Sequence, residues 1–146
     1  MSAPGMIFAL FVALAPAWVR AETLSGPILA NVVRVLDGDT IVVHARIWLG
    51  QYVETAVRVL GVDTPETGAR AKCEAERQAG EAAKQFTKAA MPPETRVRLT
   101  SIEPDKYGGR VLANVVLSDG KDFAQALILA GHARPYDGGA RAGWCG

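Results

Sequence analysis

The chain has 146 residues, of which 49% are hydrophobic, and its 16 basic residues nearly balance its 15 acidic ones. This length and composition fit one domain with a packed core and exclude a disordered or fibrous protein. The near-zero charge also excludes binding of nucleic acid through a strongly basic surface, so a polyanion would have to meet local positive groups or a bound cation.

The first segment is an unbroken apolar run from Met6 to Ala15, followed by Val19-Arg20-Ala21. A short apolar core that ends in small residues predicts a secretory signal cleaved after Ala21, and hence an exported protein, periplasmic or secreted. An uncleaved membrane anchor is the alternative, but the run is shorter than the roughly 20 residues that a span needs. Cleavage separates a signal peptide, 1–21, from a domain, 22–146, with a formal charge of zero.

Three strand-like segments open the predicted domain, at 28–36, 40–48 and 52–60. They are rich in β-branched residues, and the turns Asp37-Gly38 and Gly50-Gln51 separate them. Such runs between turn signals predict an antiparallel meander.

A helix is predicted from Glu74 to Met91, because this segment is rich in Ala, Glu, Lys and Gln and stops at Pro92-Pro93. Its expected apolar stripe is Ala75, Ala79, Ala82, Ala83 and Phe86.

Two further strands are predicted at 96–101 and 111–117, then a short helix at 123–130 with Asp122 as its cap and Gly131 at its end. Five short strands with two or three helices predict an α+β fold, whose core is a five-stranded Greek-key barrel of the OB type. The tail after Pro135 is expected to be irregular. We expect the large side chains of Trp48, Phe86 and Phe123 in the core, and His44 and His132 in structural or surface positions.

Two cysteines, Cys73 and Cys145, fall in the predicted domain. In an oxidising compartment they are expected to form a disulfide that fixes the C-terminal tail to the start of the long helix. Two separate thiols remain the alternative.

Three polar clusters lie at strand ends or in loops. Asp37-Gly38-Asp39-Thr40 reads by itself as a hairpin turn, although a second acid is more than the turn requires. In the second cluster, 58–66, Arg58 points away from the core valines, and Asp63 and Glu66 follow the strand; a solvated charge and a helix-capping acid are the plain alternatives. The third cluster, 105–110, is a glycine loop with Lys and Arg on either side of Tyr, which fits a phosphate or an ordinary exposed loop.

Taken together, the clusters favour one kind of chemistry. Asp39 and Asp63, from separate loops, can share a hard cation such as calcium or magnesium. Two guanidinium groups can bracket a phosphate, and Glu66 can orient or deprotonate a water. A cation, arginines and an activated water are what phosphodiester hydrolysis requires.

The segments DGDT, RVLGVDTPE and DKYGGRVLA, in this order between Val35 and Ala133, resemble the staphylococcal nuclease (thermonuclease) family. The resemblance implies an OB-type barrel and a calcium-dependent endonuclease that cuts DNA and RNA with little sequence choice and leaves 3′-phosphate ends. It also implies roles for individual residues. Calcium would be held by Asp39, Asp63 and the backbone carbonyl of Thr64.

The remaining implied roles concern catalysis and substrate. Asp37 would support the calcium site from behind, and Glu66 would be the general base. Arg58 and Arg110 would bind the phosphate from opposite sides, with Lys106 and Tyr107 contacting a nucleotide's phosphate. The protein is expected to be a monomer without stable membrane association after cleavage.

This sequence departs from the family pattern by the additional Gly109, which shifts Lys106 and Tyr107 relative to Arg110. A pair of tyrosines near the end, used for base stacking in the family, is represented only by Tyr136. A non-catalytic OB-fold nucleic-acid-binding module or an envelope domain is the alternative function, but neither needs this set of acids and arginines.

Overall fold

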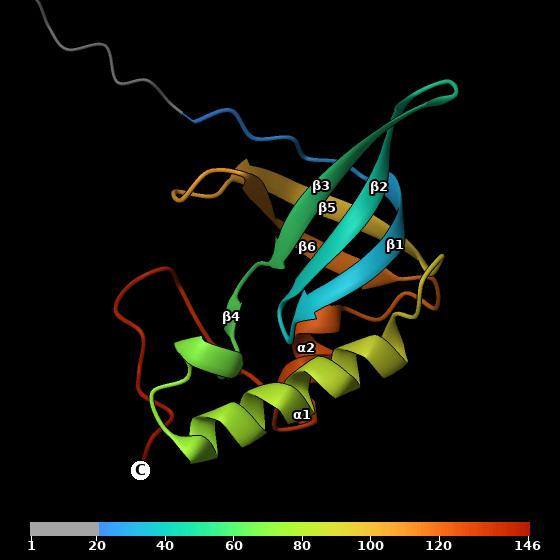
Figure 1. The fold of residues 1–146 in the computed structure, drawn as a ribbon. Helices are drawn as coiled ribbons and strands as arrows, with labels where there is room; N and C mark the ends of the chain where they lie inside the picture. The colour runs from blue at the N-terminus through green and yellow to red at the C-terminus, as the bar shows by residue number, and fades with distance from the viewer. Residues whose placement is uncertain (1–20) are drawn as a thin grey trace, which may run out of the picture.

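The computed structural model describes residues 21–146, so the predicted signal peptide lies outside the described residues apart from Ala21. Five strands close into a barrel in the order β1-β2-β3-β6-β5 (Figure 1). They are β1 (Ile28–Asp37), β2 (Thr40–Trp48), β3 (Gln51–Val59), β5 (Arg96–Pro104) and β6 (Arg110–Leu117). The predicted five-stranded barrel is confirmed, and each predicted strand lies at the expected place.

The barrel closes through two different kinds of pairing. The pairs β1–β2, β2–β3, β1–β5 and β5–β6 are antiparallel, whereas β3 and β6 run parallel. Alternation along the strands sends one set of side chains inward, and full burial of each aliphatic side chain contributes about 1.5–3 kcal/mol. The fully buried side chains of the barrel include Val32, Ile41, Val43, Val57, Val59, Val97, Leu99 and Val115.

The β2–β3 hairpin runs past the barrel and projects into solvent at its tip (Figure 1). Trp48 is therefore 69% exposed, and the expectation of a core position for it is wrong. Phe123 is fully buried, and Phe86 packs against the core, as expected. His44 lies half-exposed beside Glu54, and the ring of His132 lies 4.9 Å from that of Phe86.

The long helix α1 (Glu74–Ala90) lies beneath the barrel. The Cys73 sulfur accepts from the Glu76 backbone N–H at its start, and Met91 follows its end, before the two prolines. Its buried face matches the predicted stripe in part: Ala83 is buried and Ala79 and Phe86 are partly buried, whereas Ala75 and Ala82 are exposed. The stripe missed Glu76, Gly80 and Thr87, which are buried because this face also packs on loop backbone, which accepts small and polar residues.

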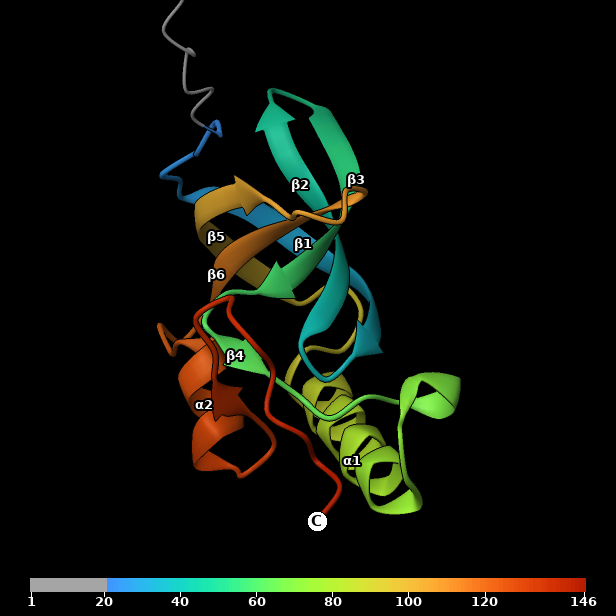
Figure 2. The same cartoon turned by 90° about the vertical axis from the view of Figure 1, so that its left-hand side faces the viewer.

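The remaining elements are short. A 3₁₀ turn, η1 (Gly68–Arg70), precedes α1, and α2 (Phe123–Leu129) begins with Asp122 accepting from the Gln125 backbone N–H, as predicted. The two-residue strands β4 (Val62–Asp63) and β7 (Arg134–Pro135) pair with each other, which the sequence did not indicate. After β7 the chain descends between α2 and α1 (Figure 2).

None of the helices within residues 21–146 has the length and hydropathy to cross a membrane.

Candidate active site

All three polar clusters meet at one cleft of about 620 Å³ between the open end of the barrel and the loops that lead to α1. The predicted site residues that line it are Asp37, Asp39, Arg58, Thr64, Glu66, Lys106, Tyr107 and Arg110. Asp63 is the exception, since it is only 4% exposed and does not line the cleft.

Two carboxylates and one arginine form the centre of the site. Nη2 of Arg58 lies 3.4 Å from Asp39 Oδ2 and 3.3 Å from Asp63 Oδ1, so both carboxylates reach the same nitrogen. Asp39 also accepts from the Thr40 hydroxyl at 2.9 Å and from the Thr64 backbone N–H at 3.4 Å. Burial raises the pKa of Asp39, and the Asp63 charge adds to this, although Arg58 and the two hydrogen bonds oppose the shift.

The strand pairing explains how the two predicted arginines come to one cleft. In the parallel β3–β6 ladder, Ala56 pairs with Arg110 and Arg58 pairs with Leu112. Residues two apart on a strand share a face, so both arginines leave the same face of the sheet.

Arg110 is fixed by a buried acid of its own loop. Its Nε lies 2.5 Å from Asp105 Oδ2, and the other Asp105 oxygen accepts from the Tyr107 backbone N–H at 3.1 Å. Burial alone would raise the pKa of Asp105, but these two partners outweigh it and lower the pKa. Gly108 and Gly109 both have φ of +69°, so the additional glycine adopts a turn conformation that Arg110 does not share. Lys106 and Tyr107 stay at the rim of the cleft.

Asp37 lines the cleft and braces the loop that carries Glu66. Its Oδ1 accepts from the Thr67 hydroxyl at 2.7 Å, and its Oδ2 lies 2.5 Å from Arg70 Nη2. Arg70 in turn places its Nε 3.3 Å from Glu66 Oε2. Burial raises the pKa of Asp37, but the bonds to Thr67 and Arg70 exceed that effect and lower it.

The buried face of α1 holds both acid-bearing loops, which the sequence did not reveal. A side chain at Gly80 would place Cβ 2.3 Å from the Glu66 carbonyl oxygen, so only glycine allows this approach. The Thr87 hydroxyl donates to the Gly38 carbonyl at 2.6 Å. Glu76 accepts from the backbone N–H of Lys72 at 2.7 Å and of Glu66 at 3.4 Å; the first of these bonds dominates the lowering of its pKa.

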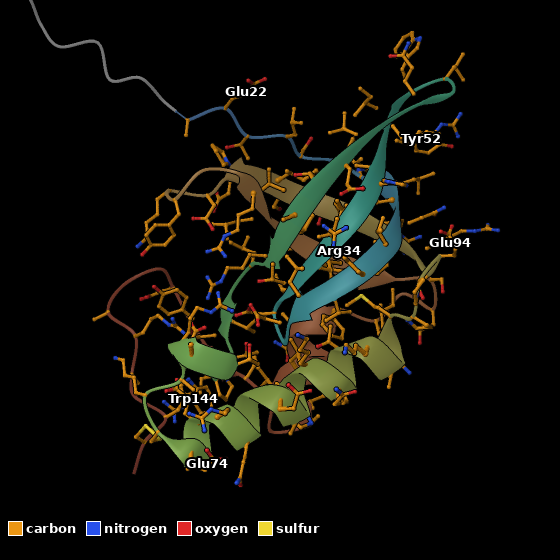
Figure 3. The ribbon with its side chains drawn as sticks, in the orientation of Figure 1. Glu22, Arg34, Tyr52, Glu74, Glu94 and Trp144 are labelled. Atoms are coloured by element: carbon orange, nitrogen blue, oxygen red, sulfur yellow. A yellow bond between two sulfur atoms is a disulfide. The ribbon has the colours of Figure 1, made fainter. Side chains whose placement is uncertain are left out.

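The C-terminal tail forms the last wall of the site. Cys145 is bonded to Cys73, the pairing that the sequence predicts, so these sulfurs are not available as metal ligands despite the nearby Glu76 carboxylate. Arg141 reaches Asp63 and Glu66, and the Trp144 indole N–H donates to Asp63 Oδ2 at 3.2 Å. Figure 3 shows Trp144 near the start of α1. The sequence signals that this tail belongs to the site were the two cysteines and Tyr136, whose ring centre lies 5.5 Å from Arg58 Cζ.

The geometry agrees with the comparisons to known proteins. The family described as "Staphylococcal nuclease homologue" matches residues 56–141, more than half of the chain. An uncharacterized endonuclease of Escherichia coli is 31% identical over 114 residues, which cover 78% of this chain and 65% of that protein. A thermonuclease of Staphylococcus intermedius is 47% identical over 104 residues, which cover 69% of this chain and 55% of the relative. The matched region thus spans slightly under two thirds and about half of these relatives. The family match, which includes Arg58, the loop of residues 63–66 and Arg110, establishes that this chain belongs to the staphylococcal nuclease family.

Proposed function

We propose that the chain is a calcium-dependent nuclease that hydrolyses phosphodiester bonds of DNA and RNA with little sequence specificity and leaves 3′-phosphate ends. One observation carries this proposal: Asp39 and Asp63 reach the same nitrogen of Arg58, while Glu66 and Arg110 line the adjoining cleft. The names of the two relatives, endonuclease and thermonuclease, support the same reaction.

The donor atoms of the centre fit a hard divalent cation. Asp39 and Asp63 offer carboxylate oxygens, and Thr64 offers a carbonyl oxygen that lies 3.4 Å from Arg141 Nη2. Calcium prefers such all-oxygen sets. When bound, the cation would supply positive charge for the negative charge that develops on the phosphoryl oxygens.

The chain's own residues supply the rest of the chemistry. Glu66 accepts a proton from the attacking water, whose oxygen forms the new bond to phosphorus. Arg58 and Arg110 bind the phosphate from two sides and stabilise its charge in the transition state. The bond from phosphorus to the 5′ oxygen breaks, that oxygen takes up a proton from solvent water, and the phosphate stays on the 3′ end. Lys106 and Tyr107, which line the cleft, would contact a nucleotide's phosphate, and Asp37 would support the calcium ligands through the loop that it braces.

The test is digestion of plasmid DNA and of RNA by the purified protein with calcium, and then with a chelator, followed by end-group analysis. We expect cleavage of both substrates with calcium, 3′-phosphate products and no cleavage with chelator. Binding of nucleic acid without cleavage would instead identify a non-catalytic OB-fold module.

Three substitutions examine the assigned roles. Arg58→Ala and Arg110→Ala are each expected to lower turnover by several orders of magnitude, as loss of a transition-state arginine does, on the order of 10³-fold. Glu66→Gln is expected to slow the chemical step while calcium binding persists. Arg98→Ala, on an exposed position of β5, is the matched control and keeps normal turnover. Normal rates in folded Arg58 or Arg110 variants would refute these roles.

The protein is further proposed to be exported to the periplasm or medium as residues 22–146, and to act as a monomer without stable membrane association. The disulfide supports this, because such bonds persist in oxidising compartments. N-terminal sequencing of the exported protein should begin at Glu22. An intact N-terminus in the membrane fraction would contradict the proposal.

A further inference from the structure

Two contacts hold the tail after β7 beside residues 63–66, the loop that carries Asp63 and Glu66. Its disulfide joins Cys145 to Cys73, just before α1. The Arg134 guanidinium stacks on the Trp144 ring, 3.6 Å from its centre, and donates to the Gly143 carbonyl at 2.7 Å. The tail therefore lies against the site through covalent and stacking contacts, and it presents Arg141 to the cleft.

Arg141 contacts the same groups that are assigned to the cation and the water. Its Nη2 lies 2.6 Å from Asp63 Oδ1 and 3.4 Å from the Thr64 carbonyl oxygen, and its Nη1 lies 2.7 Å from Glu66 Oε1. An arginine guanidinium stays protonated in proteins, so Arg141 serves as a counter-ion of these two acids.

A calcium ion and this guanidinium compete for the same oxygens. Calcium needs oxygen ligands at about 2.3–2.6 Å, so an ion held by Asp63 Oδ1 and the Thr64 carbonyl would lie against the positively charged Nη2 of Arg141, which is 2.6 Å from that carboxylate oxygen. The second oxygen of Asp63 is already taken by the Trp144 indole N–H. With its side chain 40% exposed, Arg141 has space to move into solvent.

We propose that Arg141 is a tethered counter-ion of the catalytic site, which binds the Asp63 and Thr64 oxygens assigned to the cation together with the Glu66 carboxylate, and which calcium must displace. This inference rests on the proposed function. The disulfide raises the local concentration of the guanidinium at the acids, as a short tether does. The tail consequently lowers the apparent calcium affinity, and the cation-free protein keeps its acids paired.

The test measures calcium binding by titration calorimetry, without nucleic acid. Arg141→Gln is expected to bind calcium about tenfold more tightly than the unaltered chain, a change of roughly 1.4 kcal/mol. Arg46→Gln, at an exposed position of β2, removes the same charge away from the cleft and should leave the affinity unchanged. Equal tightening in both variants would mean a general charge effect and would overturn the inference.

A second arm needs no substitution at Arg141. Reduction of the disulfide, with the fold checked by circular dichroism, should tighten calcium binding by the unaltered chain and should not change that of Arg141→Gln. Equal calcium affinity of the unaltered chain and Arg141→Gln, with no effect of reduction, would overturn the inference and mark Arg141 as a fixed structural contact.

Failure of the underlying function has a different signature. Asp39→Asn should abolish the calcium binding measured in both proteins. If neither the unaltered chain nor Arg141→Gln binds calcium, the proposed function falls, and the inference with it. If Asp39→Asn binds calcium as tightly as the unaltered chain and Arg141→Gln does not tighten it, the ion binds elsewhere and the inference is overturned.

Discussion

The substitution Gly80→Ala tests whether α1 sets the position of Glu66. In an unconstrained helix, alanine in place of glycine would stabilise the fold by about 1 kcal/mol. Here the new Cβ would lie 2.3 Å from the Glu66 carbonyl oxygen and 2.8 Å from that of Pro65, both of them backbone atoms that cannot rotate away. Overpacking of this kind costs about 1–3 kcal/mol, so we expect the free energy of unfolding to fall by up to about 2 kcal/mol net.

The same clash should appear in catalysis. Relief of a contact this short requires the Glu66 loop to move, and a misplacement of about 1 Å costs roughly 10²-fold in rate. Urea unfolding and turnover at saturating calcium measure the two effects. Ala82→Gly, at an exposed position of α1, is the control: it should lose about 1 kcal/mol of stability with normal turnover. A Gly80→Ala protein that is more stable than the unaltered chain and turns over normally would refute the reasoning.

Three further outcomes are expected. Thr87→Val leaves a buried carbonyl of the β1–β2 turn without its donor and should lower the free energy of unfolding by about 1–3 kcal/mol in urea titrations; an unchanged midpoint would remove that role. Asp105→Asn breaks the ion pair with Arg110 and should raise KM for nucleic acid. Because the folded-state pKa of Asp105 is lowered, its carboxylate adds stability above its ordinary pKa of about 3.9, and this stability is lost as pH falls through the folded-state pKa. The free energy of unfolding of the variant should therefore fall less steeply with decreasing pH than that of the unaltered chain. Cys145→Ser opens a loop of 72 residues' separation and should lower the free energy of unfolding by about 4 kcal/mol in the chain-entropy model; a loss under 1 kcal/mol would show that the tail adds little to the fold.

Local sequence patterns predicted the barrel well because its strands obey local rules. Alternation with turn residues between the runs placed β1, β2 and β3 within about one residue of their observed ends, and Pro92-Pro93 placed the end of α1. The parallel pairing of β3 with β6 could not be read in this way, since it depends on how distant segments meet. Trp48 was misplaced for a similar reason: composition shows a strand but not that it runs beyond the barrel.

In the candidate site, too, local sequence identified some residues and only the three-dimensional arrangement identified the others. The acids and arginines stood out as charged residues at strand ends, and the structure brings Asp39, Asp63 and Arg58 together. The residues that hold them did not stand out. Gly80 looks like a helix-weakening residue until the Glu66 carbonyl lies against it, and Arg141 looks like one charge in an irregular tail until the disulfide brings it to Asp63.

The parallel β3–β6 ladder also has a consequence for refolding. Direct pairing of these two strands sets the spacing between Arg58 and Arg110. A partly folded molecule that holds the β1–β2–β3 meander and α1 without this pairing lacks two arginines arranged for one phosphate. Recovered cleavage after dilution from denaturant would therefore report the formation of the β3–β6 pairing, and circular dichroism would follow the gain of secondary structure separately.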